Sequence, residues 1–207
     1  MVRRKVKDLC IIIGLLIFSF FSFIAAYYIG KNEYDNKKEE TKIEEFFKEE
    51  DEYVPEDTTK TEESEKEEIK EVTYTFVLEI PKIGLKKGFY GIGLYSNTVS
   101  QNIMMLNKSD YPNKDKGNVM LAAHNGSSAV SFFDKLDKTD NGDKVFLYYQ
   151  GIKYEYILSN RYDIPKTGSA KIYRDYDKNT ITLITCKKNT KDKQVVYIGY
   201  LNNKINY

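Results

Sequence analysis

The sequence predicts a mostly β domain, a sandwich or a closed barrel with short helices, preceded by a transmembrane helix and a charged linker. Three observations predict this organisation: an uncharged apolar run near the N-terminus, a segment dominated by glutamate and lysine, and a C-terminal part built of short β-like runs. Residues 31–72 carry 18 acidic residues against 8 lysines, whereas residues 73–207 carry 20 basic residues against 12 acidic ones. Such opposed compositions do not share one fold.

The first element is a membrane anchor at residues 9–29, preceded by a basic cytoplasmic tail at residues 1–8. The anchor, LCIIIGLLIFSFFSFIAAYYI, has 21 residues and no charge, and about 20 apolar residues span a bilayer as a helix. The basic residues of the tail predict a cytoplasmic N-terminus and an extracellular remainder. A cleaved signal peptide is the alternative, since Ala25 and Ala26 are small, but the run is longer than a usual signal-peptide core. We expect a single-pass protein of the cell membrane.

Residues 30–72 are expected to form a charged, flexible stalk. Their composition offers too little apolar surface to offset chain entropy, and self-repulsion extends a charged linker. Within this segment TKIEEFFKEE, residues 41–50, is compatible with a short amphipathic helix against a partner. A solvated spacer is the expectation for it.

The domain at residues 73–207 is predicted from alternating apolar residues. Phe76, Leu78 and Ile80 fall on one face of a strand. The strand-like runs are residues 73–81, 117–124, 143–150, 152–164, 180–186 and 194–201. Helical spacing after an Asn97 cap predicts a helix over 97–106, and a serine cap predicts another over 127–139. Many short strands with few helices predict a sandwich or a barrel.

Two residues at predicted strand ends carry the chemistry. Cys186 ends one strand-like run and precedes the charged loop KKNTKDK, while Cys10 lies in the apolar anchor. His124, the only histidine, ends another run. Two separated thiols and one histidine form neither a disulfide framework nor a zinc site, but a thiol with a histidine base is a usual nucleophile. We therefore expect a Cys186–His124 pair.

Other functional classes are excluded by the sequence. The segment GFYGIG lacks the Lys-Ser/Thr of a phosphate-binding loop, and we expect no cofactor and no metal. The positive charge of the domain would suit nucleic acid. Outside a cell, however, the available polyanions are wall and lipid-headgroup polymers, so we expect no nucleic-acid partner.

Three stretches together resemble the sortases, membrane-anchored cysteine transpeptidases on the surface of Gram-positive bacteria. They are TLITC at 182–186, LAAHNGSSAVSFFDKL with the histidine 62 residues before the cysteine, and VLEIPKIGL at 77–85. The resemblance covers residues 73–203. The order His before Cys differs from papain-like proteases and matches L,D-transpeptidases, but these carry a glycine where Thr185 stands. The short stretch before residue 181 and the lack of a lid signature before residue 73 indicate the compact A, D or E classes.

The resemblance implies a closed eight-stranded sortase-type barrel and a thiol-protease-like transpeptidation. Cys186 would attack the Thr–Gly carbonyl of an LPxTG-type sorting signal and form a thioester, and His124 would act as general acid and base. The implied partners are secreted surface proteins with a C-terminal sorting signal and an amine acceptor. That acceptor would be a wall precursor or a pilin lysine.

One departure concerns an arginine that sortases carry on the strand after the cysteine. Alignment on the motif puts Gln194 at that position, and no arginine follows Arg174. A glutamine amide can donate to an oxyanion but lacks the charge and fork of a guanidinium. Three interpretations follow. Gln194 is the hydrogen-bond donor to the oxyanion, or Arg174 or Arg161 reaches the oxyanion instead, or the protein is a sortase with weakened or no activity.

Further substrate-binding candidates are Thr185, Asn125 and Arg174, each with a structural alternative. The structural alternative is an ordinary strand residue for Thr185, a turn residue before glycine for Asn125, and an ion pair with a nearby aspartate for Arg174. Four residues line either a signal-binding pocket or the core: Tyr90, Tyr95, Val130 and Phe133. Two non-catalytic hypotheses remain, an inactive sortase-fold module that binds sorting signals or wall polymers, and a β-rich surface interaction domain.

Overall fold

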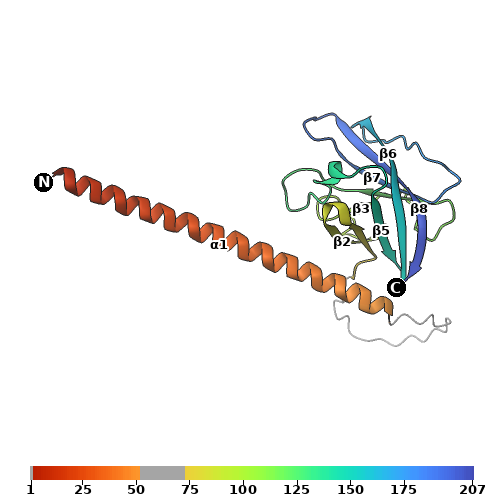
Figure 1. Cartoon of the computed structure of the whole chain (residues 1–207), viewed down its shortest axis with the longest axis horizontal. Coiled ribbons are helices and arrows are strands. Elements are labelled where there is room, and N and C mark those ends of the chain that lie inside the picture. Colours follow the sequence, from red (N-terminus) through yellow and green to blue (C-terminus); the bar gives the residue numbers. More distant parts are fainter. Residues whose placement is uncertain (1, 52–72) are drawn as a thin grey trace. The chain divides into compact units, whose positions relative to one another are not determined.

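A computed structural model describes residues 2–51 and 73–207 of the chain (Figure 1). The chain divides into two compact units, Met1–Thr41 and Lys42–Tyr207. The part of the predicted stalk at residues 52–72 lies outside the described residues. The second unit contains all the strands and the candidate site.

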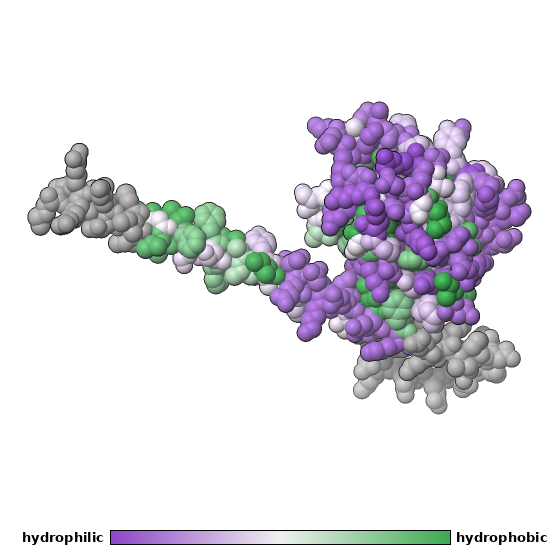
Figure 2. Space-filling view, in the orientation of Figure 1, coloured by the Kyte–Doolittle hydropathy of each residue, from purple (hydrophilic) through white to green (hydrophobic). Residues whose placement is uncertain are grey.

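Helix α1 (Val2–Asp51) contains the predicted membrane anchor. It is the one helix in the described ranges that is long and apolar enough to cross a membrane, with a mean hydropathy of 2.0 in its most apolar window. Its large apolar side chains from Ile13 to Ile29 are exposed and form a green band in Figure 2. The helix continues to Asp51, so the first part of the predicted stalk is helical rather than extended.

The domain is a nearly closed eight-stranded β-barrel, which confirms the predicted fold class and decides between sandwich and barrel. Its strands are β1 (Phe76–Ile80), β2 (Leu85–Phe89), β3 (Met104–Met105), β4 (Asn118–Ala122), β5 (Lys144–Tyr149), β6 (Ile152–Pro165), β7 (Thr180–Cys186) and β8 (Lys193–Asn206). They are ordered β2-β1-β5-β6-β8-β7-β4-β3. All pairs are antiparallel except β4 with β7, and a bridge between Tyr90 and Met104 joins the two edges. Figure 1 shows β5, β6 and β8 side by side in one wall.

The barrel core explains why the alternation of apolar residues predicted the strands. Phe76, Leu78 and Ile80 are fully buried, as their alternation predicts. The Phe76 ring stacks on Phe89 at 5.0 Å and on Tyr149 at 4.8 Å between centroids. Burying each such side chain contributes roughly 1.5–3 kcal/mol, so the aromatic residues of β1, β2 and β5 stabilise this side of the barrel.

The outer face of β1 is also covered, by the last turns of α1. Ile43 and Phe46 are buried and cluster with Val77, which is fully buried. Phe47 packs edge-on against Tyr148, with the ring centroids 5.2 Å apart. Residues at i, i+3 and i+4 share one helix face, so this segment is the amphipathic helix that the sequence allowed, and its partner is the chain's own barrel.

Neither predicted helix forms in the domain. Asn97 does not cap a helix; its side chain accepts from the Met105 amide at 2.7 Å and donates to the Met105 carbonyl at 2.9 Å. Ile103 and Met105 are both fully buried, a period of two that favours the short strand β3. Between 127 and 139 only the 3₁₀ turn η2 (Leu136–Lys138) forms; the Phe133 amide donates to the His124 carbonyl at 3.1 Å instead of to a carbonyl one helical turn back. A second such turn, η1 (Pro81–Ile83), follows β1.

Candidate active site

The site lies where the parallel strands β4 and β7 end side by side. Their register runs to the pair Ala122↔Ile184, and both strands point the same way. Extending this register by two residues sets His124 beside Cys186. Neighbouring strands lie about 4.8 Å apart and paired residues share a face. The topology therefore brings the two predicted catalytic residues to one sheet edge.

Hydrogen bonds continue the connection beyond the last registered pair. The Ala123 amide donates to the Ile184 carbonyl at 3.3 Å, and the Thr185 hydroxyl donates to the Ala123 carbonyl at 2.8 Å. The Asn125 side-chain amide donates to the Cys186 carbonyl at 2.8 Å. The residues on both sides of His124 are thus tied to the end of β7. Thr185 is buried, and its hydroxyl bonds to the backbone of β4.

Access differs between the residues of this edge. His124 is exposed and Cys186, a free thiol, is partly exposed, so both can meet a substrate. The side-chain amide oxygen of Asn125 (Oδ1) is buried and has no hydrogen-bond partner among the described residues. Within the described ranges no group of three or more metal-ligating side chains gathers.

Gln194 lies directly across from Cys186. The antiparallel register of β7 and β8 pairs these two residues, and residues opposite each other in an antiparallel pair project to the same face. Gln194 is partly buried and has Ile164 of β6 on its other side. Its amide is therefore on the face that carries the thiol.

The structure brings neither Arg174 nor Arg161 beside Cys186 and Gln194. Arg174 donates to the Lys116 and Lys178 carbonyls, both at 3.1 Å, and to the Thr180 hydroxyl at 3.3 Å. Thr180 begins β7 and Cys186 ends it, a separation of roughly 20 Å along the strand. Arg161 is paired with Tyr197, and Tyr197 belongs to the barrel core. Side chains alternate between the two faces of a strand, so the Arg161–Tyr197 pair lies on the face opposite Cys186 and Gln194.

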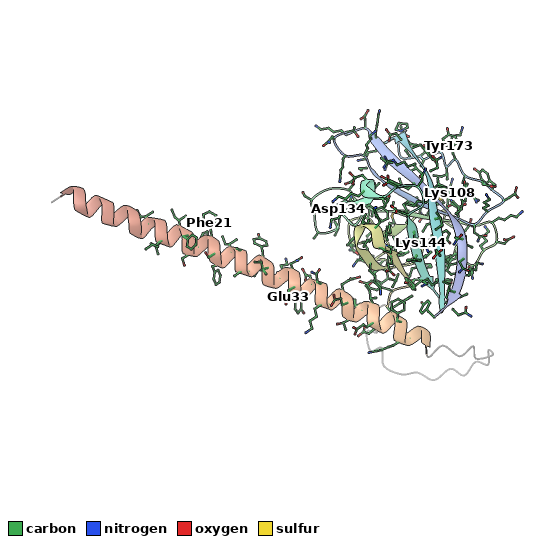
Figure 3. The ribbon with its side chains drawn as sticks, viewed as in Figure 1. Phe21, Glu33, Lys108, Asp134, Lys144 and Tyr173 are labelled. Atoms are coloured by element: carbon green, nitrogen blue, oxygen red, sulfur yellow. The ribbon has the colours of Figure 1, made fainter. Side chains whose placement is uncertain are left out.

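An apolar floor adjoins Cys186 on the outer face of the sheet. Ile164, Ile184, Val196 and Ile198 are buried there in a second cluster, apart from the barrel core. The segment between β6 and β7 covers part of this floor, and two tyrosine hydroxyls hold it. Tyr162 accepts from the Tyr173 amide at 2.8 Å, and Tyr200 accepts from the Asp175 amide at 2.9 Å. Figure 3 labels Tyr173 on this segment.

The four residues considered for a signal-binding pocket are divided by the structure. Phe133 is fully buried in the barrel core, so of its two predicted positions, pocket or core, it occupies the core. The Tyr90 ring packs on Tyr74 at 5.1 Å. Tyr95 is 91% exposed, and Val130 is partly buried. Sequence reasoning missed the floor itself, because its apolar residues come from β6, β7 and β8 and meet only through the register.

A cavity of about 650 Å³ opens on the other face of the same strands. Thr185 and Lys187, which flank Cys186, both line it. Lys187 forms an ion pair with Asp163, and Lys188 forms one with Asp137 at 2.8 Å. These pairs fasten the loop after Cys186 to β6 and to η2.

Arg161 and Tyr197 form the wall of this cavity away from the loop. Burial raises the pKa of Tyr197, while a hydrogen bond from Arg161 and the charge of its guanidinium oppose that rise. The phenol therefore stays neutral. No signal in the sequence connected these two residues, which lie 36 positions apart and are paired across β6 and β8.

Comparison of the sequence with known proteins identifies relatives. A family model described as Sortase domain matches residues 78–201. Sortase A of Bacillus anthracis is 34% identical over 83 residues, which is 40% of this chain and 39% of that protein. Sortase A of Listeria monocytogenes is 36% identical over 87 residues, 42% of this chain and 39% of that protein.

Solved structures agree with the fold. The crystal structure of Listeria monocytogenes sortase A matches with a TM-score of 0.55 at 23% identity, covering 65% of this chain and 90% of that one. At this identity the likeness shows the fold alone. The chain spans about two-fifths of the length of the two curated relatives that it matches, 39% in each case.

Proposed function

Because the chain belongs to the sortase family, we propose that it is a membrane-anchored cysteine transpeptidase with Cys186 as nucleophile and His124 as general acid and base. One observation carries the proposal: the parallel register of β4 and β7, extended by two residues, sets His124 beside Cys186. The side-chain bond from Asn125 to the Cys186 carbonyl supports it, because it connects the residue after His124 to the cysteine itself.

The proposed reaction has two steps. The Cys186 thiolate attacks the Thr–Gly carbonyl of an LPxTG-type sorting signal, a thioester forms, and the C–N bond breaks as His124 protonates the leaving glycine amine. In the second step an amine attacks the thioester, the C–S bond breaks, and His124 takes the amine proton. The threonine is then joined to the acceptor by a new amide, and the thiolate is regenerated.

Gln194 is the proposed hydrogen-bond donor to the oxyanion of both tetrahedral intermediates. Its support is the direct pairing with Cys186 in β7 and β8, together with the positions of Arg161 on the opposite face and of Arg174 at the far end of β7. Removal of one such donor raises the barrier by about 3 kcal/mol in other enzymes. The apolar floor around Ile184 and Val196 is the proposed seat of the apolar part of the signal.

The proposed setting is the cell surface. Residues 1–8 form a cytoplasmic tail, residues 9–29 the anchor and residues 73–207 the extracellular catalytic domain. Secreted proteins with a C-terminal sorting signal are the donors. A wall precursor or a pilin lysine supplies the amine.

Trapping of the thioester tests the proposal. The purified chain should cleave an LPxTG-type peptide, and mass spectrometry should find the acyl fragment on Cys186. Cys186→Ala and His124→Ala should each abolish cleavage, while Cys10→Ser, matched in residue type, should leave it unchanged. Absence of both cleavage and acylation across a broad set of signals would refute the enzyme.

A second candidate function is a sortase-fold module that binds sorting signals without cleaving them. The absence of any arginine after Arg174 favours it, since an uncharged amide stabilises an oxyanion less than a guanidinium does. Binding of the same peptides by wild-type and Cys186→Ala chains, with no acyl fragment on the wild type, would establish this alternative.

A further inference from the structure

We propose that the cavity lined by Arg161 binds the carboxylate of a peptide amine acceptor, the second substrate of the reaction. The inference rests on the proposed function and deepens it by assigning the acceptor its own site. It concerns the face of the sheet opposite Cys186 and Gln194. No residue of the proposed catalytic set lines this cavity among the described residues.

The cavity adjoins the nucleophile without containing it. Its lining includes Thr185 and Lys187, one residue to either side of Cys186, and Asn125, which bonds to the Cys186 carbonyl. Because side chains alternate along a strand, Cys186 faces the outer floor while its two neighbours face the cavity. A molecule in the cavity can therefore reach the thioester around the end of β7.

The charges in the cavity leave one cation uncompensated. Five charged side chains line it, and four of them form the ion pairs Lys187–Asp163 and Lys188–Asp137. The fifth is Arg161, which no carboxylate pairs with among the described residues; its partner is the neutral Tyr197 phenol. Asp163 and Asp137 face the same space, but each already has a lysine.

The chemistry of Arg161 selects a carboxylate. A guanidinium presents parallel N–H donors that match the two oxygens of a carboxylate. Tyr197 and Val195 supply an apolar wall beside it, which strengthens such a contact relative to open water. Among the described residues, Arg161 is thus a guanidinium without a carboxylate partner in a cavity next to the strand end that carries Cys186.

The acceptor fits this site better than the donor does. While the thioester exists, the acyl part of the sorting signal remains bonded to Cys186 on the outer face, so the amine has to arrive from elsewhere. From Arg161 to Cys186 the sheet spans two strand spacings and three residues, roughly 14 Å between Cα atoms. An arginine side chain and an extended peptide of three to five residues, at about 3.3–3.6 Å each, cover that distance.

The experiment compares acceptors that differ only in their terminal charge. Full-length protein in detergent is acylated with a sorting-signal peptide and supplied with tri-, tetra- or pentaglycine, each as the free acid and as the amide. Transfer product and hydrolysis product are measured separately. For at least one length the wild type should prefer the acid in kcat/KM for the acceptor by about fivefold or more.

Variants of Arg161 identify the origin of that preference. Arg161→Ala should remove the preference for the acid, and Arg161→Lys should restore part of it, whereas acylation and hydrolysis rates stay within about twofold of the wild type. Lys108→Ala, which removes an exposed cation elsewhere (Figure 3), should keep the preference. Thermal unfolding checks that the variants are folded.

The outcomes separate the two proposals. If Cys186 is never acylated, the proposed function fails. If acylation occurs but no glycine length shows an acid preference that depends on Arg161, the acceptor site is refuted while the enzyme stands. A loss of acylation in Arg161→Ala that Arg161→Lys does not rescue would instead assign Arg161 to the first step, and would equally overturn the inference.

Discussion

Gln194 is the residue on which the efficiency of the proposed chemistry depends. Its pairing with Cys186 puts an amide donor on the face of the thiol. Gln194→Ala should therefore lower kcat for peptide cleavage by at least about tenfold while thermal unfolding is unchanged. Gln194→Arg should raise kcat if the uncharged donor limits the wild type.

A matched variant makes this prediction specific. Gln101 is exposed in a turn before β3, so Gln101→Ala should leave kcat unaltered. Unchanged turnover in Gln194→Ala would remove Gln194 from the mechanism.

Glu155 predicts a pH dependence of stability. It is 8% exposed and accepts from Lys144 at 3.0 Å and from Asn202 at 2.7 Å; Lys144 is labelled in Figure 3. The hydrogen bond from Lys144 is the main cause that lowers the pKa of Glu155 below its ordinary value of 4.5. The charged carboxylate thus contributes stability above pH 4.5, and this contribution disappears as pH falls through the lowered pKa.

Urea unfolding of wild type and Glu155→Gln should show this contribution directly. The difference in the free energy of unfolding should be about 1 kcal/mol at pH 6–7 and should shrink below pH 4. The exposed residue Asp115 provides the control Asp115→Asn. A difference independent of pH would contradict the role of the charge.

At this scale the sequence singled out the candidate reactive residues but not the residues that surround them. Cys186 and His124 stood out as rare residue types at strand ends. Asn125 was considered for substrate binding or for a turn, and the structure shows its side-chain amide bonded to the Cys186 carbonyl. Arg161 was considered for the thiol face, and only the register of β6 with β8 assigns it to the opposite one.

Among the elements, the end of α1 makes the most testable contribution. Phe46 is 3% exposed and packs with Ile43 against Val77. Truncation of a buried phenylalanine costs roughly 3–5 kcal/mol in a core. In the fragment 42–207 this segment is the N-terminal end, and chain ends open locally at low cost, so we expect Phe46→Ala to cost less, about 2 kcal/mol.

Urea unfolding of the fragment 42–207 measures the effect. Glu44→Ala, at an exposed position on the same helix, should change the free energy of unfolding by less than about 0.5 kcal/mol. Equal stability of Phe46→Ala and wild type would mean that the segment is a spacer, as the composition alone suggested.

Strands were more predictable than helices for a physical reason. The runs that became β1, β4, β5, β6, β7 and β8 are either alternating or short continuous apolar stretches, the two patterns that buried strands produce. β2 was not predicted because LKKGF has no apolar alternation, and β3 was not predicted because it is only two residues long. The predicted helices over 97–106 and 127–139 do not form because the Asn97 side chain bonds to the backbone of Met105 and the Phe133 amide bonds to the His124 carbonyl, in place of helical bonds.

For the whole molecule, the prediction concerns which side of the membrane carries the thiol. The apolar length of α1 suits one membrane crossing, and the basic residues before it predict a cytoplasmic N-terminus. Residues after the anchor, Cys186 included, should then lie outside. In intact cells a membrane-impermeant maleimide should label the Cys10→Ser chain, whose only thiol is the partly exposed Cys186.

The same experiment distinguishes the opposite topology. Addition of Cys186→Ala to that chain should abolish labelling, and permeabilisation should not increase the signal of the Cys10→Ser chain. Labelling that appears only after permeabilisation would place the barrel in the cytoplasm, where no secreted protein would present its sorting signal. The proposed reaction would then lack its donor even with Cys186 and His124 correctly paired, so the orientation of α1 is as much a condition of the function as the site itself.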